Sequence, residues 1–193
     1  KQEKPRLTML NLFASGIFRQ LPGNFMWLPD ESGFLYTDRG TYMLWNIEDG
    51  KGKKLFGLNE LRQMLMKDRE PREGEGMGNT NATGRFNRSA MTLSADGSAL
   101  LGVMDNDVYV YNIASGEATF VTDDAGVEEF QEFSPDSTKV AYAKDHNLYV
   151  LNLADGTETQ LTDNDGNDEI WNGVADWVYE EELSVRRAFW WSP

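Results

Sequence analysis

Short runs of alternating apolar and polar residues, separated by tight-turn sequences, recur along most of this chain. The alternation has the period of two that is expected of β-strands with one buried face. Asp-Gly, Ala-Asp-Gly and Ser-Pro-Asp stand between the runs and favour hairpin turns. The pattern therefore predicts an all-β chain of short antiparallel strands.

The runs fall into repeated units that each read as four strands joined by turns. Ala95 and Pro135 stand at the same turn of two successive units and are 40 residues apart. A four-stranded blade of a β-propeller repeats at about 40–50 residues. We therefore predict a β-propeller fragment of four-stranded antiparallel blades, with about three blades and the start of a fourth. The four units begin at residues 25–36, 91–103, 130–142 and 189–193.

Two intervals between units are longer than the repeat, and the first of them predicts an insertion at 56–88. Leucines at helical spacing predict a short helix from Asn59 to Arg69, with Asn59 as its cap. The segment 71–84 after it has the composition of an exposed loop. Its glycines resemble a phosphate loop only superficially, because no strand leads into them and no Lys-Ser/Thr follows.

The second long interval predicts an insertion at 163–187, which contains three consecutive glutamates at 180–182 and precedes an aromatic strand at 189–191. Asp176 is placed to cap a short helix by accepting hydrogen bonds from backbone N–H groups two or three residues on, with the glutamates near its first turn. From the pattern alone, these acids form either a solvated helix face or a binding site for a small cation such as an ammonium group.

Candidate catalytic and metal-binding residues are scarce. The acidic run 163–168 alternates oxygen-bearing side chains but lacks the twelfth-position glutamate of an EF-hand, so we interpret it as a turn between blades rather than a calcium site. The single histidine, His146, falls in a predicted turn, and the sequence contains no Gly-x-Ser-x-Gly. We therefore expect no metal, no cofactor and no catalytic residue within this chain.

Charge and composition narrow the range of partners. The formal net charge is −14, from 18 Lys and Arg against 32 Asp and Glu. Such a chain repels nucleic acid and anionic membrane surfaces, whereas a cationic peptide terminus is attracted. There is no cysteine, so disulfides and thiolate metal sites are excluded. No apolar run reaches the length of a membrane span.

The second insertion resembles one family closely. Asn172-Gly173, then Asp-Trp-Val-Tyr-Glu-Glu-Glu at 176–182, then Trp-Trp-Ser-Pro at 190–193, are similar to the dipeptidyl peptidase IV family of prolyl-oligopeptidase-type serine peptidases. The resemblance implies that Glu181 and Glu182 bind the free α-amino group of a peptide substrate. Glu180, Asp176 and Tyr179 would support that site.

The resemblance also implies an architecture. Residues 1–193 would be part of an N-terminal propeller with a ring of eight blades, and the insertion at 163–187 would project into the active-site cavity. An α/β-hydrolase domain beyond residue 193 would supply the Ser, Asp and His that release N-terminal Xaa-Pro or Xaa-Ala dipeptides. Family members are exported, whether periplasmic, secreted or membrane-anchored, and a homodimer is compatible with the resemblance.

One position departs from the family. In animal members, a loop of the preceding blade brings an arginine into the cavity, whereas the matching hairpin here, at 102–107, contains none. Arg85 and Arg88 are the candidate replacements. The sequence does not decide whether Arg186 and Arg187 balance the glutamates or face solvent.

Two other classes of function are compatible with these residues. One is a propeller without catalysis that binds a protein or a peptide, and the other is a periplasmic scaffold propeller without a peptide site. A Gly-x-Ser-x-Gly beyond residue 193 would favour the peptidase over both.

Overall fold

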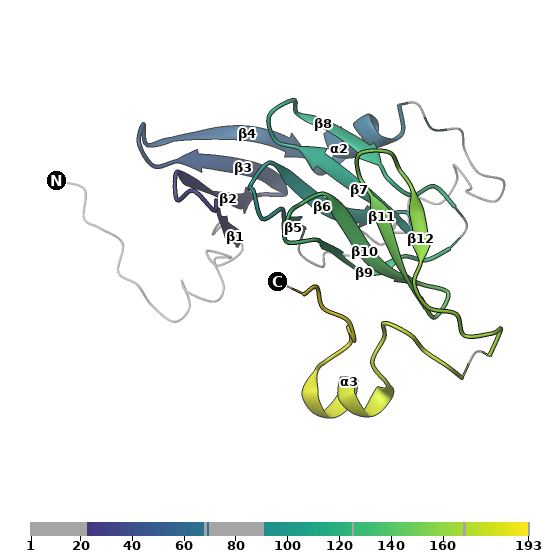
Figure 1. Cartoon of the computed structure of the whole chain (residues 1–193). Helices are drawn as coiled ribbons and strands as arrows, with labels where there is room; N and C mark the ends of the chain where they lie inside the picture. Colours follow the sequence, from purple (N-terminus) through teal and green to yellow (C-terminus); the bar gives the residue numbers. More distant parts are fainter. Residues whose placement is uncertain (1–22, 68, 70–90, 125, 168, 193) are drawn as a thin grey trace, which may run out of the picture. The chain divides into compact units, whose positions relative to one another are not determined.

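The computed structural model describes residues 23–67, 69, 91–124, 126–167 and 169–192. In these residues the chain forms three four-stranded antiparallel sheets and two short helices (Figure 1). The chain divides into two compact units, Lys1–Glu60 and Leu61–Pro193. The predicted all-β class and the four-stranded antiparallel blades are confirmed.

The first unit contains one sheet, in which each strand pairs with the next along the chain. Its strands are β1 (Gly23–Trp27), β2 (Gly33–Asp38), β3 (Thr41–Asn46) and β4 (Lys51–Gly57). Strands β2 and β3 are joined by Arg39 and Gly40, which both have positive φ angles (49° and 78°). Two such residues form the hairpin turn whose twist matches the strands it joins.

The two faces of this first sheet differ in exposure. Leu35, Tyr42 and Phe56 are buried, and the rings of Tyr42 and Phe56 stack with centroids 4.9 Å apart. The opposite face presents a layer of mutually contacting aromatic rings, and on it Trp27 is 65% exposed. The rings of this layer are those of Phe25, Trp27, Phe34, Tyr36 and Trp45.

The predicted helix in the first insertion is present as α2 (Leu58–Leu65), with Leu61 and Leu65 buried. The prediction that Asn59 caps this helix is wrong. The helix begins one residue earlier, and the Glu60 carboxylate accepts a hydrogen bond of 2.7 Å from the Gly57 backbone N–H. A glutamate at the third helical position commonly bonds back in this way. The remainder of this insertion, 70–88, lies outside the described residues.

The second unit contains two sheets of the same design. The second sheet consists of β5 (Thr92–Leu93), β6 (Ala99–Met104), β7 (Asp107–Asn112) and β8 (Glu117–Phe120). The third consists of β9 (Glu129–Phe133), β10 (Lys139–Lys144), β11 (Asn147–Asn152) and β12 (Glu158–Gln160).

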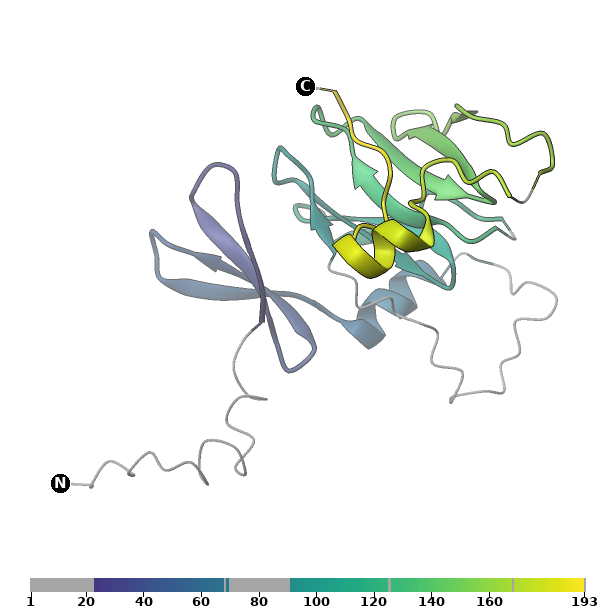
Figure 2. The same ribbon diagram turned by 90° about the horizontal axis from the view of Figure 1, so that it is seen from below.

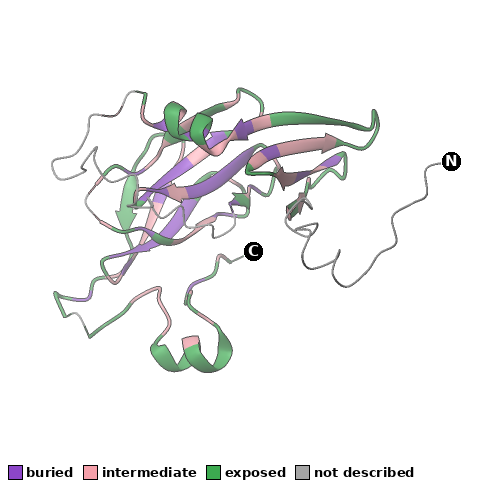
Figure 3. Cartoon of the chain, turned by 180° about the vertical axis from the view of Figure 1, so that it is seen from behind, coloured by how far each residue is buried: buried purple, intermediate pink, exposed green. Residues whose placement is uncertain are grey.

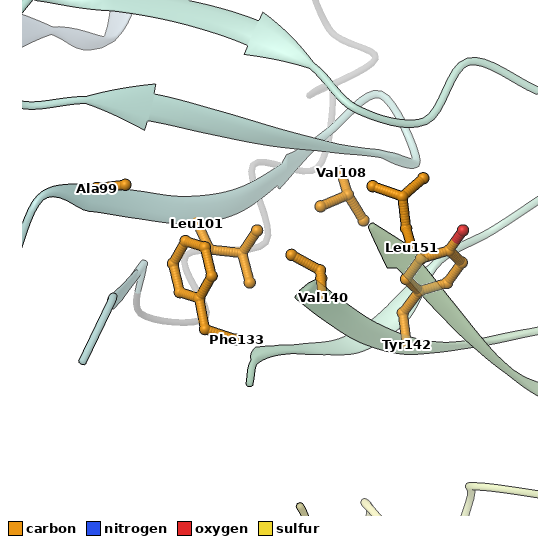
Figure 4. Packing of buried hydrophobic residues seen from close by; sticks show 7 residues of the cluster. All are labelled: Ala99, Leu101, Val108, Phe133, Val140, Tyr142 and Leu151. Carbon is orange, nitrogen blue, oxygen red and sulfur yellow. The ribbon is translucent and has the colours of Figure 1, made fainter. Parts of the chain in front are cut away.

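These two sheets pack face to face. Leu101 and Val108 of the second sheet point toward Phe133 and Val140 of the third (Figure 4). Alternate residues of each strand reach this interface, as the period of two requires. The buried cluster is completed by Ala99, Tyr142 and Leu151.

The second unit also contains a cluster of charges around the buried Lys144. The Lys144 Nζ donates hydrogen bonds to Asp124 at 2.7 Å and to Glu158 at 3.0 Å. Burial disfavours the ammonium, but these two carboxylates outweigh burial and raise the pKa of Lys144. Burial and a hydrogen bond to Glu158 together raise the pKa of the Tyr142 hydroxyl.

Glu128 is the exception in this group. Glu128 is only 3% exposed, and both of its carboxylate oxygens are buried. Burial, and then the charges of Asp124 and Asp107, raise the pKa of Glu128 to about 7, and Lys144 offsets only part of that shift. Glu128 is therefore the group in this cluster that changes charge near neutral pH.

Candidate functional site: the α3 insertion and its hollow

The glutamate-bearing insertion forms a short helix, α3 (Trp177–Leu183). The Asp176 carboxylate accepts hydrogen bonds from the backbone N–H groups of Val178 (2.9 Å) and Tyr179 (3.2 Å), so its predicted role as the cap is confirmed. Ser184 ends the helix in a left-handed conformation (φ 54°), and its N–H donates to the Glu180 carbonyl. Both ends of α3 are thus satisfied locally.

Two arms of chain carry α3 and meet at its base. Val174 and Arg187 form an isolated antiparallel bridge. The Ala175 N–H donates to the Arg186 carbonyl at 2.8 Å, and the Ala188 N–H donates to the Gly173 carbonyl at 3.0 Å. Figure 1 shows α3 standing off the third sheet on these arms, and in Figure 2 it is the part of the second unit nearest to the viewer. The insertion is therefore a closed loop with a hydrogen-bonded neck.

Arg187 fastens this neck to the third sheet. Its guanidinium lies 2.6 Å from the Glu132 carboxylate on β9, and 5.5 Å from the centroid of the Phe189 ring. The Trp191 indole N–H donates to the Glu132 carbonyl at 3.4 Å. Of the two arginines left open by the sequence, Arg186 pairs with a glutamate of the run, Glu180, whereas Arg187 pairs with Glu132 on β9.

The three glutamates are not equivalent. Glu180 lies in the first turn of α3, as expected, but Glu181 and Glu182 follow it toward the other end of the helix. Glu181 and Glu182 are exposed and form no ion pair within the described part of the chain. Figure 3 shows α3 exposed along most of its length, with one part of intermediate burial. The insertion therefore presents two adjacent carboxylates that Arg186 does not neutralise.

A hollow of about 1020 Å³ lies beside α3. Of the residues that the sequence proposed, Asp176, Tyr179 and Glu180 line it, whereas Glu181 and Glu182 do not. Successive side chains of a helix point roughly 100° apart, so those at 177, 180 and 183 share the face of α3 that lines the hollow. Glu182 lies on the opposite face of the helix, and Glu181 lies at its flank.

Sequence reasoning did not identify most of the lining. Phe130, Trp171 and Trp190 come from three separate segments, and Glu129 and Glu169 supply charge. Of these five residues, only Trp190 had a signal in the sequence, because it belongs to the aromatic run. The other residues converge through the path of the chain, which no local pattern shows.

Phe130 reaches the hollow through a β-bulge. Phe130 and Gln131 together oppose Tyr142, and Phe130 has a φ of 59°. A positive φ is a true outlier for so bulky a residue. A bulge changes the direction in which its side chains point, and here it places Phe130 in the lining of the hollow.

His146 lies in the β10–β11 turn, as predicted, and its ring stacks on Trp171 with centroids 4.6 Å apart. Within the run 163–168, residues 165 and 166 form a turn in which Asp163 and Asn164 accept hydrogen bonds from backbone N–H groups two residues on, and residue 168 lies outside the described residues. No group of three metal-ligating side chains occurs in the described residues.

The predicted aromatic strand at 189–191 is wrong, since these residues are not assigned to a strand. No neighbouring strand pairs with them in the part of the chain that is described, and an unpaired segment lacks ladder hydrogen bonds. Arg85 and Arg88 lie outside the described residues. No helix of the described chain is long and apolar enough to cross a membrane.

Comparisons with known proteins agree with this architecture. Residues 103–193 match the family model described as the dipeptidyl peptidase IV (DPP IV) N-terminal region. The chain is similar to human "Prolyl endopeptidase FAP", with 35% identity over 86 residues, covering 44% of this chain and 11% of that protein. It is also similar to feline "Dipeptidyl peptidase 4", with 42% identity over 62 residues, covering 32% of this chain and 8% of that protein.

A solved structure extends the likeness in fold to nearly the whole chain. The crystal structure of Porphyromonas gingivalis dipeptidyl peptidase 4 superposes with a TM-score of 0.61 and 22% identity, covering 97% of this chain and 26% of that one. The chain thus spans a small part of each relative. Together, the sequence matches and this likeness in fold support a dipeptidyl peptidase IV family N-terminal region.

Proposed function

We propose that this chain is the substrate-positioning part of a serine-type dipeptidyl peptidase, in which Glu181 and Glu182 bind the free α-amino group of a peptide. A downstream α/β-hydrolase domain would then release N-terminal Xaa-Pro or Xaa-Ala dipeptides. An exported location is part of the same proposal.

The observation that carries the proposal is the pair of exposed carboxylates on a helix that is fixed at both ends. An ammonium group has three donors, and two adjacent carboxylates can accept from it together. At an effective dielectric constant of about 20, one such contact at 4 Å has a Coulomb energy of about 4 kcal/mol, part of which desolvation removes. Glu180 is already engaged by Arg186, so Glu181 and Glu182 are the two left to bind a substrate cation.

The function of this binding would be positional. An amino end held at a fixed point limits how far the peptide backbone reaches toward a nucleophile, so cleavage would follow the second residue. Orientation of this kind lowers the barrier by removing the entropy cost of aligning the reactants.

The test is the hydrolysis of a Gly-Pro reporter amide by the full-length protein. Glu181→Gln and Glu182→Gln should each lower kcat/KM by about thirtyfold or more, which corresponds to about 2 kcal/mol. Glu180→Gln is the matched control and should have a much smaller effect. Acetylation of the reporter's amino group should abolish the difference between the wild type and the variants. Unchanged kcat/KM in both variants would reject the ammonium-binding role.

A further inference from the structure

The hollow beside α3 has an aromatic lining that the amino-end site does not use. Trp171, Trp177 and Trp190 line it from different segments, and Phe130 reaches it from β9. Trp177 is 73% exposed and Trp190 is 69% exposed. Large aromatic side chains left this open indicate a binding surface, because their burial is favourable.

The lining is also negatively charged. Four acidic and two basic side chains line the hollow. Arg186 is paired with Glu180, and Arg187 with Glu132. Glu129 and Glu169 form no ion pair in the described part of the chain, so their charge remains available to a ligand.

The backbone geometry of Phe130 is an independent sign of function. A φ of 59° is costly for phenylalanine, and such strain persists where the surrounding structure imposes it, often in ligand sites. Here the strained residue belongs to the bulge that brings an aromatic ring to the hollow, next to the Glu129 carboxylate. An aromatic ring and a carboxylate thus come from adjacent positions of one strand.

We propose that this hollow binds the side chain of an arginine in a polypeptide ligand. The faces of aromatic rings attract cations, and tryptophan does so most strongly. A guanidinium is flat, so it can stack on an indole while it donates hydrogen bonds to a carboxylate. Glu129 and Glu169 supply the carboxylates, and Trp177 and Trp190 supply the ring faces, since His146 already stacks on Trp171. The site is separate from Glu181 and Glu182, and it requires no free amino end.

The experiment measures binding to the intact protein by calorimetry, with acetyl-Gly-Arg-Gly-amide as the probe. The same peptide with citrulline in place of arginine is the matched control, because citrulline keeps the shape and loses the charge. Both peptides lack a free amino end, so the proposed peptidase function does not affect the result. We expect the arginine peptide to bind at least about tenfold more tightly than the citrulline peptide.

Two protein variants identify the site. The double variant Glu129→Gln/Glu169→Gln should lose at least about tenfold in affinity, and Trp177→Ala should lose severalfold while it keeps both charges. All three residues are exposed, so these changes leave the fold intact. The control Glu181→Gln/Glu182→Gln should bind the arginine peptide as the wild type does.

Three results would overturn the proposal. The first is equal affinity for the arginine and citrulline peptides, or no binding of either. The second is unchanged affinity in the Glu129→Gln/Glu169→Gln variant. The third is a loss of binding in the Glu181→Gln/Glu182→Gln variant, which would place the cation at the amino-end site instead.

Discussion

The first and third sheets have the same strand register, but the equivalent face is buried in the third sheet and largely exposed in the first. In both, an asparagine at the end of the third strand pairs with the first residue of the second strand: Asn46 with Gly33, and Asn152 with Lys139. Trp45 therefore corresponds to Leu151. Leu151 is 3% exposed against the second sheet, whereas Trp45 is half-buried in a layer of aromatic rings.

The same correspondence holds along the face. Phe34 corresponds to Val140, and Trp27 to Phe133, and in each pair the residue of the third sheet is the more buried one. The alternation of residues along the strands is therefore enough to make one face of a blade apolar, but that face becomes part of a core only when another sheet covers it. Where it is not covered, the aromatic rings of the first sheet contact one another.

The strongest test of this comparison substitutes the matched pair. Leu151→Ala should lower the free energy of unfolding by about 2–5 kcal/mol, because it removes a buried side chain and leaves a cavity. Trp45→Ala should cost about 1 kcal/mol, the size of an aromatic pair contact. Urea denaturation of the intact protein, with hydrogen exchange of the β3 and β11 amides, measures both changes. Equal losses at the two positions would contradict the comparison.

A second test uses Glu128, which is buried in the second unit near the charge of Lys144. At the positions of Lys144 and Asn147, the first sheet has Asp38 and Thr41. The pKa of Glu128 is raised from 4.5 to about 7, so the folded state holds this proton more tightly than the unfolded state. Its contribution is complete below pH 4.5 and is lost as the pH rises through 7, by about 3 kcal/mol in total.

Glu128→Gln should therefore stabilise the protein at pH 8 relative to the wild type, and this difference should shrink on going from pH 8 to pH 5. Urea denaturation at both pH values measures it. The exposed neighbour provides the control, since Glu129→Gln should change stability by no more than about 0.5 kcal/mol. A difference that does not depend on pH would show that Glu128 ionises normally in the folded protein.

The smallest effect is expected on the exposed aromatic layer itself. The double variant Phe25→Ser/Trp27→Ser should change the free energy of unfolding by about 1 kcal/mol or less, because both residues are mostly exposed. It should nevertheless lower the fluorescence of a bound hydrophobic dye, since the dye binds exposed apolar surface. A large loss of stability would mean that this face is core, like the equivalent face of the third sheet.

The blades and the cap of α3 could be predicted from the sequence because their causes are local. Alternation sets the faces of the strands, residues such as Gly40 set the turns, and Asp176 bonds to backbone groups only two and three residues away. Local rules failed at Asn59, where Glu60 satisfied the backbone instead, and at 189–191, where no strand supplied pairing.

The candidate site depends on contacts between residues distant in the sequence. The sequence by itself determined that three glutamates stand together after the third sheet, since that is a matter of order along the chain. Only the tertiary structure decided that Arg186 engages Glu180, that Arg187 ties the insertion to Glu132, and that Glu129 and Phe130 face the hollow with Trp171. The physical reason is that ion pairs and hollows form between segments whose separation in space is set by packing and turns, which the alternation of residues along one strand does not encode.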